Sequence, residues 1–366
     1  MKVLHLLYAG GTGGIEKLCK DIGLKSTQDE NVFWFVHEGG NICEEMKCEN
    51  LEVIETHYGN KDILAVYKQI KKEVTERQID VIVVHHPAPL LWLALRLYML
   101  KKKRASVIVY AHNSYEEIIK RSSKKAVIYN SLLRKSEQVI AISEFVKSTF
   151  SHINGLPVEK ISVVYNGVDT DNYRTERSVT HEGKISLLYV GRLIPEKGVD
   201  KLLKALTFMR HKEEVFLTVV GDGSARENLE HIAKEEHLDD LVCFAGIQRN
   251  VADYLTVADV FVHPAVWEEG FGITVVEAMS AGLVCVTFSK GALPEIIQTG
   301  VNGFIVEECS ERALAQCLDR ICEGIKKNNM PEVRRNAVTR AGAFTIESLL
   351  QHLHTIYDTV GKGFKK

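Results

Sequence analysis

The chain has 366 residues, with 46 Lys and Arg against 48 Asp and Glu, which gives a formal net charge of -2. Single hydrophobic cores stop growing near roughly 250–300 residues, so this length predicts two domains. Nucleic-acid-binding proteins usually carry a basic excess, and none exists here, so nucleic acid is not an expected partner. The eight cysteines include no CxxC pair, which excludes a zinc knuckle and indicates free thiols in a reducing compartment. With no signal-peptide pattern and no run of about 20 apolar residues, we expect a cytoplasmic protein.

Short apolar runs alternate with amphipathic stretches along the whole chain. Continuous Val and Ile runs separated by helices are typical of parallel strands that are buried on both faces, so we predict an α/β fold. The first six predicted strands are Lys2–Tyr8, Val32–His37, Leu51–Glu55, Val81–His85, Ser106–Ala111 and Gln138–Ile142. The second six are Ile185–Val190, Val215–Val220, Val242–Ala245, Val260–His263, Val284–Phe288 and Gly303–Val306, and helices are expected at Lys201–Arg210 and Arg226–Glu236.

A polar segment separates the two series of strands. Thr170–Lys184 lacks hydrophobic periodicity, and a new strand begins directly after it, which is typical of an interdomain linker. We therefore predict a Rossmann-like domain over 1–169, a linker over 170–184 and a second Rossmann-like domain over 185–346. A final helix at about 347–366 is expected to pack back on the first domain. Ligands of open parallel sheets bind outside the carboxyl ends of the strands, so a cleft between the domains is the expected site.

A glycine-rich loop follows the first predicted strand. Gly10-Gly11-Thr12-Gly13-Gly14 leads into a helix that is expected to start near Ile15. Glycines there let the backbone approach a ligand, and the following helix N-terminus favours anions. The dinucleotide-binding pattern fails, because Glu16 stands where a third glycine belongs. A tight connection with no ligand is the alternative.

A cationic loop opens the second domain. Gly191, Arg192 and Lys197 lie in GRLIPEKG, directly after the strand Ile185–Val190. Arginine can bind a diphosphate in a bidentate manner and lysine as a point charge, so the loop is a candidate diphosphate site. Ordinary charges on a solvated loop are the alternative.

The third motif is EEGFGITVVEA, which carries Glu269 and Glu277 at its two ends. Its glycines lead into a helix whose first turn has no charged side chain, so the free amides there can hold a phosphate or sugar oxygen. The two carboxylates can accept hydrogen bonds from hydroxyls. A carboxylate pair also suits a glycoside hydrolase, but that chemistry gives no reason for a cationic loop nearby. Glu269 as a simple helix cap is the structural alternative.

These motifs together resemble family 4 of the retaining glycosyltransferases of the GT-B fold. GRLIPEKG, EEGFGITVVEA and NGVD at Asn166–Asp169 carry the resemblance. GGTGGIE at the amino end, AISEFVK, VVGDGSARENL and GALPEII extend it over most of the chain. The resemblance implies a nucleotide-sugar donor on the second domain and an acceptor held largely by the first. Gly291-Ala292 departs from the Gly-Gly that is common in the family, and the acceptor-side residues match no pattern.

The resemblance also implies roles for individual residues. Arg192 and Lys197 would neutralise the departing diphosphate, Glu269 would hold hydroxyls of the donor sugar, and Glu277 would bind the ribose. His112, which follows the strand Ser106–Ala111, would lie near the transferred sugar, although a histidine in that place is often structural. The implied catalytic set is Arg192, Lys197, Glu269 and His112, and the implied donor-binding set is Gly13, Gly14, Gly191, Gly270, Phe271, Gly272, Ile273, Glu277 and Glu295.

No metal and no other cofactor is expected. Asp169-Thr170-Asp171 has the DxD spacing with which some glycosyltransferases hold a divalent cation, but it lies at the start of the polar linker. Arg192 and Lys197 already bring the positive charge that such a metal would supply. We interpret the DxD as part of a turn.

A basic surface on the first domain is a candidate membrane-docking site. Lys101–Arg104 is one cluster, and Glu116–Lys135 reads as a single helix with six basic residues and apolar Ile128, Leu132 and Leu133. Anionic lipids attract such clusters, so peripheral binding to the inner face of the cell membrane, through Lys101–Arg104 and Lys120–Lys135, is expected. A solvated helix face is the alternative.

The function implied by the resemblance is sugar transfer with retention, without metal, in cell-surface polysaccharide or glycolipid assembly. The expected partners are a nucleotide-sugar donor and a glycan or lipid-linked acceptor. Two alternatives stay open: a nucleotide-sugar epimerase of the same fold, and a catalytically silent partner protein. The donor base, the sugar and the acceptor are not predicted.

Overall fold

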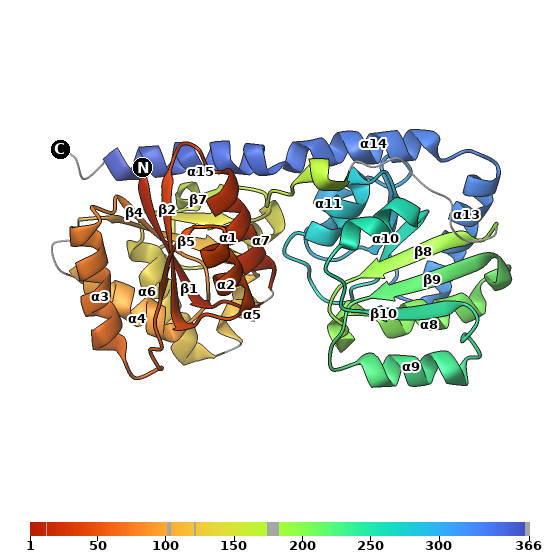
Figure 1. Cartoon of the computed structure of the whole chain (residues 1–366), viewed down its shortest axis with the longest axis horizontal. Coiled ribbons are helices and arrows are strands. Elements are labelled where there is room, and N and C mark those ends of the chain that lie inside the picture. Colours follow the sequence, from red (N-terminus) through yellow and green to blue (C-terminus); the bar gives the residue numbers. More distant parts are fainter. Residues whose placement is uncertain (12, 101–103, 121, 174–182, 363–366) are drawn as a thin grey trace. The chain divides into compact units, whose positions relative to one another are not determined.

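The computed structural model describes residues 1–366 except 12, 101–103, 121, 174–182 and 363–366. The described chain forms two compact units. Unit 1 comprises Met1–Gly167 and Ile346–Lys366, and unit 2 comprises Val168–Thr345. Each unit is a parallel sheet with helices on both faces, so the fold class is the predicted α/β (Figure 1).

Unit 1 contains a seven-stranded sheet in the order β3-β2-β1-β4-β5-β6-β7. Its strands are β1 (Lys2–Ala9), β2 (Glu30–Glu38), β3 (Glu52–Glu55), β4 (Val81–Val84), β5 (Ser106–Ala111), β6 (Gln138–Ala141) and β7 (Ile161–Val163). Its helices are α1 (Gly14–Lys25), α2 (Asn41–Cys48), α3 (Ile63–Glu76), α4 (Pro89–Leu100), α5 (Tyr115–Ile119), α6 (Ser123–Lys135), α7 (Glu144–Phe150) and α15 (Ile346–Gly361), with a 3-10 turn at Val158–Lys160. All residues of β4 and β5 are buried, because helices cover both faces of the sheet.

Unit 2 contains a six-stranded sheet in the order β10-β9-β8-β11-β12-β13. Its strands are β8 (Ile185–Val190), β9 (Val215–Val220), β10 (Val242–Gly246), β11 (Val260–His263), β12 (Val284–Phe288) and β13 (Phe304–Val306). Its helices are α8 (Val199–Phe208), α9 (Arg226–Glu235), α10 (Val251–Val257), α11 (Ile273–Ser280), α12 (Leu293–Ile296), α13 (Glu311–Lys326) and α14 (Pro331–Ala341), with 3-10 turns at Thr170–Tyr173, Pro195–Lys197, Lys212–Glu214 and Gly342–Phe344. A core of Val, Leu and Ile side chains lies between the sheet and these helices.

The boundaries between the units differ slightly from the predicted ones. The backbone NH of Val168 donates to the carbonyl of Phe344, and Val168 also bridges Thr345, so Val168 and Asp169 belong to unit 2. Ile346 opens α15 and belongs to unit 1. The predicted linker begins as the 3-10 turn Thr170–Tyr173, and its residues 174–182 lie outside the described part of the chain.

The prediction of a single helix over Glu116–Lys135 is wrong. Lys120 adopts a left-handed conformation (φ 47°) and ends α5, and the hydroxyl of Ser122 then caps α6. Leu132 and Leu133 of α6 are completely buried in unit 1, so neither is available at the surface. The strand pattern also does not predict β7, whose three residues pair with β6 at the edge of the sheet.

Helix α15 packs in unit 1 beside α1 and β4 (Figure 1). The hydroxyl of Ser106 at the start of β5 donates to the carbonyl of Val360 (2.8 Å), and Nδ1 of His354 lies 3.1 Å from both carboxylate oxygens of Asp29. The Asp29 carboxylate also accepts from the amino group of Met1 at 2.9 Å. The loop before β2 is therefore tied to the last helix of the chain.

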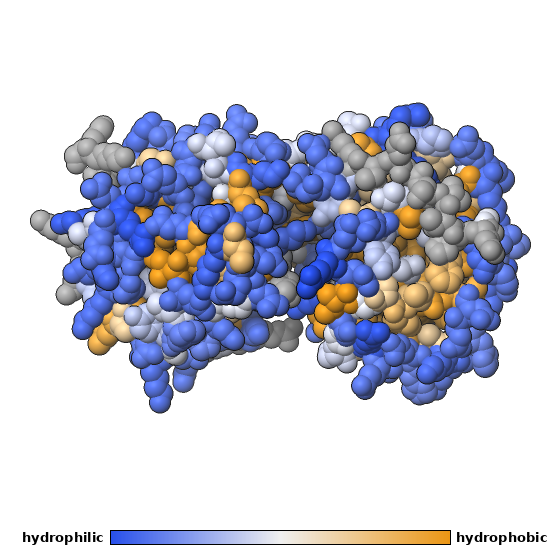
Figure 2. Space-filling view, in the orientation of Figure 1, coloured by the Kyte–Doolittle hydropathy of each residue, from blue (hydrophilic) through white to orange (hydrophobic). Residues whose placement is uncertain are grey.

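Each unit has a mainly hydrophilic surface around its apolar core, with apolar residues showing between polar ones on the face seen in Figure 2. Within the described residues, no helix has both the length and the apolar character needed to cross a bilayer.

Candidate functional site

The loops that carry the predicted donor-binding residues meet at one edge of the unit 2 sheet. The cationic loop follows β8, the loop that contains Glu269 joins β11 to α11, and Gly291 lies after β12. These three strands are neighbours in the sheet. Strand order reverses between β8 and β11, because β9 and β10 lie on one side of β8 and β11 to β13 on the other. Ligands of doubly wound sheets bind at such a switch point, beyond the carboxyl ends of the strands.

The loop after β9, which contains Gly221 and Gly223, contacts the cationic loop through its backbone. The NH of Gly191 donates to the carbonyl of Val220, and the NH of Leu193 donates to that of Asp222. A Cβ on Gly221 would lie 1.9 Å from the carbonyl oxygen of Gly191, so only glycine allows this approach. Arg192 is exposed, and its backbone carbonyl accepts from the hydroxyl of the buried Tyr189 at 2.9 Å.

Glu269 is a buried carboxylate with three donors on one oxygen. Its Oε1 accepts from the Lys197 ammonium, from Nε1 of Trp267 (3.2 Å) and lies 3.1 Å from Nε2 of His263. Burial alone would raise the pKa of this carboxyl, but the hydrogen bond and charge of His263, together with the Lys197 ammonium, hold the pKa well below its usual range. Glu269 is therefore an ionised acceptor and not a helix cap.

Lys197 is held in place before any ligand arrives. Its ammonium is paired with Glu269 and lies 5.8 Å from the centroid of the Trp267 ring. An ammonium has three donors, so Lys197 can keep its carboxylate partner and still donate to an anion. The site thus offers one exposed cation, Arg192, and one preorganised cation, Lys197.

The N-terminus of α11 is open toward its preceding loop. Gly272 occupies the N-cap position with φ 104°, has no side chain to cap the helix, and no acidic residue lies in the first turn. The amides of Val275 and Val276 donate to the carbonyl of Gly272, whereas those of Ile273 and Thr274 have no acceptor within the helix. Gly291 (φ 57°) packs on the same loop, since a Cβ there would lie 2.1 Å from the carbonyl oxygen of Glu269. Gly270, which lies between Glu269 and Gly272 in the sequence, is half-buried.

Three other predicted residues have defined structural contacts. Glu277 is 5% exposed, and its Oε1 accepts from the hydroxyl of Tyr173 at 2.8 Å. Phe271 is buried edge-on against Phe344, with centroids 5.3 Å apart. Glu295 is half-buried in α12, and its backbone carbonyl accepts from Arg340. Glu269 and Glu277 therefore have different surroundings, one cationic and one phenolic.

In unit 1 the predicted residues also follow strands of the sheet, at its carboxyl ends. The glycine loop follows β1 and His112 follows β5, with β4 between them in the sheet. Gly13 is the N-cap of α1, with its carbonyl accepting from Lys17, and Gly14 is the first helical residue. Gly10 packs so closely on Gly39 that a Cβ would lie 1.7 Å from its carbonyl oxygen, which makes this part of the loop a tight connection.

His112 lies at the carboxyl end of β5 and is 9% exposed. Its Nε2 lies 3.0 Å from Nδ1 of His85, and its ring stacks on Tyr110 with centroids 4.4 Å apart. Burial lowers the pKa of His112 to about 3, with a smaller contribution from His86, so its ring is neutral near pH 7. A neutral imidazole can accept one hydrogen bond and donate one.

Two sequence models of known families match this chain in succession. The model described as Glycosyltransferase Family 4 matches residues 28–172, and the model described as Glycosyl transferases group 1 matches residues 172–337. The chain belongs to the family 4 glycosyltransferases.

Individual relatives agree with this membership. An uncharacterised glycosyltransferase of Methanocaldococcus jannaschii is 32% identical over 201 residues, which is 51% of each chain, so the chain spans about half the length of this relative. A lipopolysaccharide 1,2-N-acetylglucosaminetransferase of Salmonella typhimurium is 25% identical over 74% of this chain and 70% of its own. The fold matches that of Anabaena Alr3699/HepE in complex with UDP, with a TM-score of 0.85, 21% identity and coverage of 98% and 100% of the two chains. This is the GT-B fold.

Asp169 of the DxD spacing takes part in a local contact at the start of the predicted linker. Asp169 accepts a hydrogen bond from the Asn172 side chain at 2.9 Å, as in a turn. The candidate ligand cluster in the described chain is Cys43, Glu44 and Glu55, on unit 1. The ammonium of Lys47 already bonds both of these carboxylates, and burial raises the pKa of Cys43 to about 11, so the cluster fits a metal poorly.

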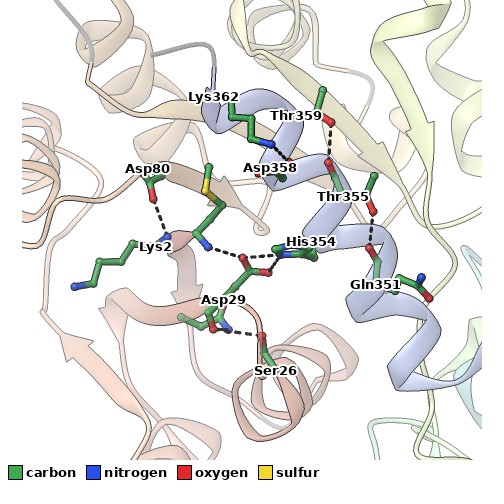
Figure 3. A network of polar contacts seen from close by, with 12 residues as sticks. Lys2, Ser26, Asp29, Asp80, Gln351, His354, Thr355, Asp358, Thr359 and Lys362 are labelled. Atoms are coloured by element: carbon green, nitrogen blue, oxygen red, sulfur yellow. Dashed lines mark hydrogen bonds and ion pairs between the residues drawn. The ribbon is translucent and has the colours of Figure 1, made fainter. Parts of the chain in front are cut away.

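A cavity of about 790 Å³ lies at the opposite edge of the unit 1 sheet, and Lys2, Asp29 and Asp80 are among its lining residues. These residues stand at the amino ends of β1, β2 and β4, and Figure 3 shows Asp80 bonded to the backbone NH of Lys2 (3.0 Å). None of the predicted site residues lines this cavity. Because ligands of such sheets bind at the carboxyl ends, we do not assign the transfer site to it.

Proposed function

We propose that this family 4 glycosyltransferase transfers a sugar from a nucleoside diphosphate sugar to a hydroxyl acceptor, with retention at the anomeric carbon and without a divalent cation. One observation carries the proposal: Arg192, Lys197 and the uncapped N-terminus of α11 gather at the switch point of the unit 2 sheet. Cations and helix amides are what a diphosphate needs. Unit 2 would hold the donor and unit 1 the acceptor.

The transfer follows from this arrangement. As the bond from the anomeric carbon to the diphosphate oxygen breaks, negative charge grows on the diphosphate, where Arg192, Lys197 and the α11 amides stabilise it. The acceptor hydroxyl forms the new bond on the same face, and its proton passes to the departing phosphate oxygen. The protein contributes electrostatic stabilisation and positioning. Glu269, held ionised, accepts from hydroxyls of the donor sugar, and Glu277 from the ribose hydroxyls in exchange for Tyr173.

The biological setting is proposed from the relatives. The Salmonella relative is named for lipopolysaccharide, and another, 27% identical over 71% of this chain, is named as a putative colanic acid biosynthesis glycosyltransferase. These names support a role in cell-surface polysaccharide or glycolipid assembly, and UDP in the Anabaena structure makes UDP the first donor base to test. None of these relatives is named as an epimerase, so that alternative is not favoured.

Nucleotide binding is expected to raise the thermal stability of unit 2 in the presence of EDTA. A ligand at 100 times its Kd stabilises the native state by about 2.7 kcal/mol. Differential scanning fluorimetry with UDP, GDP and ADP identifies the base, and the shift should persist when EDTA is added. A shift that appears only with Mn²⁺ or Mg²⁺ would refute the metal-free site.

Binding to anionic membranes is a second, separate proposal. Lys120 directly after α5 and Lys124 and Lys135 on α6 are exposed, and Val127 of α6 is 69% exposed. Of Lys101–Arg104, only Arg104 lies within the described residues, where it is exposed. The buried Leu132 and Leu133 leave mainly electrostatic attraction, about 1 kcal/mol per basic residue near the surface.

We expect the protein to sediment at low salt with vesicles that contain phosphatidylglycerol, but not with pure phosphatidylcholine. Replacing Lys120, Lys124 and Lys135 by glutamine should lower partitioning by about fivefold for each lysine. A matched control replaces the exposed Lys68, Lys234 and Lys327, which makes the same change in charge elsewhere. Equal losses in both triple variants would indicate a net-charge effect and contradict a docking surface on α5 and α6.

A further inference from the structure

A row of hydrogen bonds crosses the interior of unit 1 and ends at His112. Nε2 of His5 lies 2.9 Å from Oδ1 of Asn31, Nδ1 of His5 lies 2.9 Å from Nε2 of His85, and Nδ1 of His85 lies 3.0 Å from Nε2 of His112. The four residues come from β2, β1, the end of β4 and the end of β5, which are successive strands of the sheet. We call this row the histidine array.

Asn31 determines in which direction the hydrogen bonds of the array run, that is, which nitrogen of each ring donates and which accepts. Its amide nitrogen lies 3.2 Å from the backbone carbonyl of Asp29, and a carbonyl can only accept, so the NH₂ group must face Asp29. The amide oxygen of Asn31 therefore faces His5, and it too can only accept. Nε2 of His5 must carry the proton.

The direction then passes from ring to ring. A neutral imidazole has one N–H, so protonated Nε2 leaves Nδ1 of His5 as an acceptor, which requires a proton on Nε2 of His85. The same step requires a proton on Nε2 of His112 and leaves its Nδ1 as an acceptor. Burial keeps the rings neutral, because it lowers the pKa of His5 to about 4 and that of His112 to about 3, and it holds the pKa of His85 well below its usual value.

The open end of the array is Nδ1 of His112. Within the described part of the chain no hydrogen bond reaches this atom, and it is not among the buried polar atoms that lack a partner. The atom is therefore accessible at the carboxyl end of β5, where ligands of such sheets bind. Everything behind it is enclosed, since His5 and His85 are at most 3% exposed.

We propose that Asn31 is a positioning residue that acts through His5 and His85 to fix His112 as the Nε2–H tautomer, so that Nδ1 accepts a hydrogen bond from a hydroxyl of the bound saccharide. The role of the saccharide rests on the proposed function, whereas the tautomer does not. A saccharide hydroxyl donates to this nitrogen, and a carbonyl or carboxylate oxygen cannot. The array thus selects a donor group over an acceptor group at that point of the site.

The tautomer can be read directly in the full-length protein. Histidine labelled with ¹⁵N gives two-bond ¹H–¹⁵N spectra that separate protonated from unprotonated ring nitrogens, and the signals absent from His112→Gln assign His112. At pH 7.5 we expect His112 to carry its proton on Nε2. A proton on Nδ1 of His112 in the wild-type protein would overturn the proposal, whatever the enzyme transfers.

Asn31→Leu removes the acceptor that sets the direction. The array can then reverse, and we expect His112 to show a mixture of tautomers or the Nδ1–H form. Thr56→Val is the matched control, because it deletes another side-chain partner of β2, the hydroxyl that bonds Nε1 of Trp34 at 3.0 Å, without touching the array. An unchanged His112 spectrum in Asn31→Leu, or the same change in Thr56→Val, would refute the role of Asn31.

Kinetics connects the array to the reaction. Once a donor and an acceptor are known, Asn31→Leu should lower kcat roughly tenfold, the effect of one hydrogen bond made in the transition state, while KM for the donor changes little. Thr56→Val should retain the wild-type kcat. A tautomer change in Asn31→Leu with no loss of kcat would separate His112 from the reaction and overturn the saccharide contact, but it would leave the proposed transfer function standing.

Discussion

Replacing Arg192 by alanine is expected to lower kcat/KM for sugar transfer by about 100- to 1,000-fold while the fold stays intact. The side chain is exposed and forms no ion pair with the described residues, so its removal leaves no buried charge. Surface substitutions of this kind usually change stability by less than about 0.5 kcal/mol. A preorganised donor that faces developing negative charge is worth about 100- to 1,000-fold in rate.

Two further variants sharpen this prediction. Arg192→Lys keeps the charge but loses bidentate binding, so its rate should lie between those of the wild type and Arg192→Ala. Arg210→Ala, which removes another exposed arginine of unit 2, is the control and should retain full activity. Steady-state rates and circular dichroism of the three variants suffice. A rate for Arg192→Ala within about twofold of wild type would contradict the diphosphate role of the loop.

Unit 1 is expected to lose stability steeply as the pH falls from about 6.5. Burial lowers the pKa of His5 to about 4 and of His112 to about 3, and it places that of His85 well below its usual value. In the unfolded chain these histidines titrate near pH 6.5. Between about pH 6.5 and 4 the unfolded state therefore binds more protons than the folded state. The free energy of unfolding decreases as the pH decreases, and the contribution of these histidines to stability is complete only above about pH 6.5.

The three rings together can change the free energy of unfolding by up to about 4 kcal/mol per pH unit, since each proton contributes about 1.4. In a Trp267→Phe background the remaining tryptophans, Trp34 and Trp92, both report on unit 1. Urea unfolding of this variant followed by fluorescence at pH 7 and pH 5.5 gives the slope. His5→Gln should reduce the slope by about a third, and His152→Gln, which changes an exposed histidine, should not. A free energy of unfolding that stays constant over this range would contradict neutral, buried rings.

The strands could be predicted because buried parallel strands are continuous apolar runs. Ser106–Ala111, Ile185–Val190 and Val284–Phe288 have the predicted bounds in the structure. The helix over Glu116–Lys135 could not be divided from its pattern, because the left-handed Lys120 is a matter of tertiary context. The three-residue β7 is too short to give a periodic signal.

The sequence motifs predict which residues form the site, but they do not predict the contacts between those residues. The sequence places Lys197 and Glu269 on separate loops, and only the pairing of β8 with β11 brings them together. His263, Trp267 and Tyr173 could not be predicted, because each acts by contacting another functional residue. His5 carries a signal, since a histidine interrupts the apolar run of the first strand, but its partners Asn31 and His85 are distant in sequence.

The most direct test of the account is the anomeric configuration of the first product, followed by ¹H NMR while the enzyme turns over an α-linked nucleotide sugar in EDTA. The donor base is taken from the thermal-shift screen, and the acceptor from a panel of glycans and lipid-linked sugars. In our account Arg192, Lys197 and the amides of α11 hold the diphosphate, and the acceptor attacks the anomeric carbon on the face from which the diphosphate departs. The account therefore predicts an α-linked product, formed as fast with EDTA as without it. A β-linked product, or turnover that stops with EDTA and returns with a divalent cation, would contradict it.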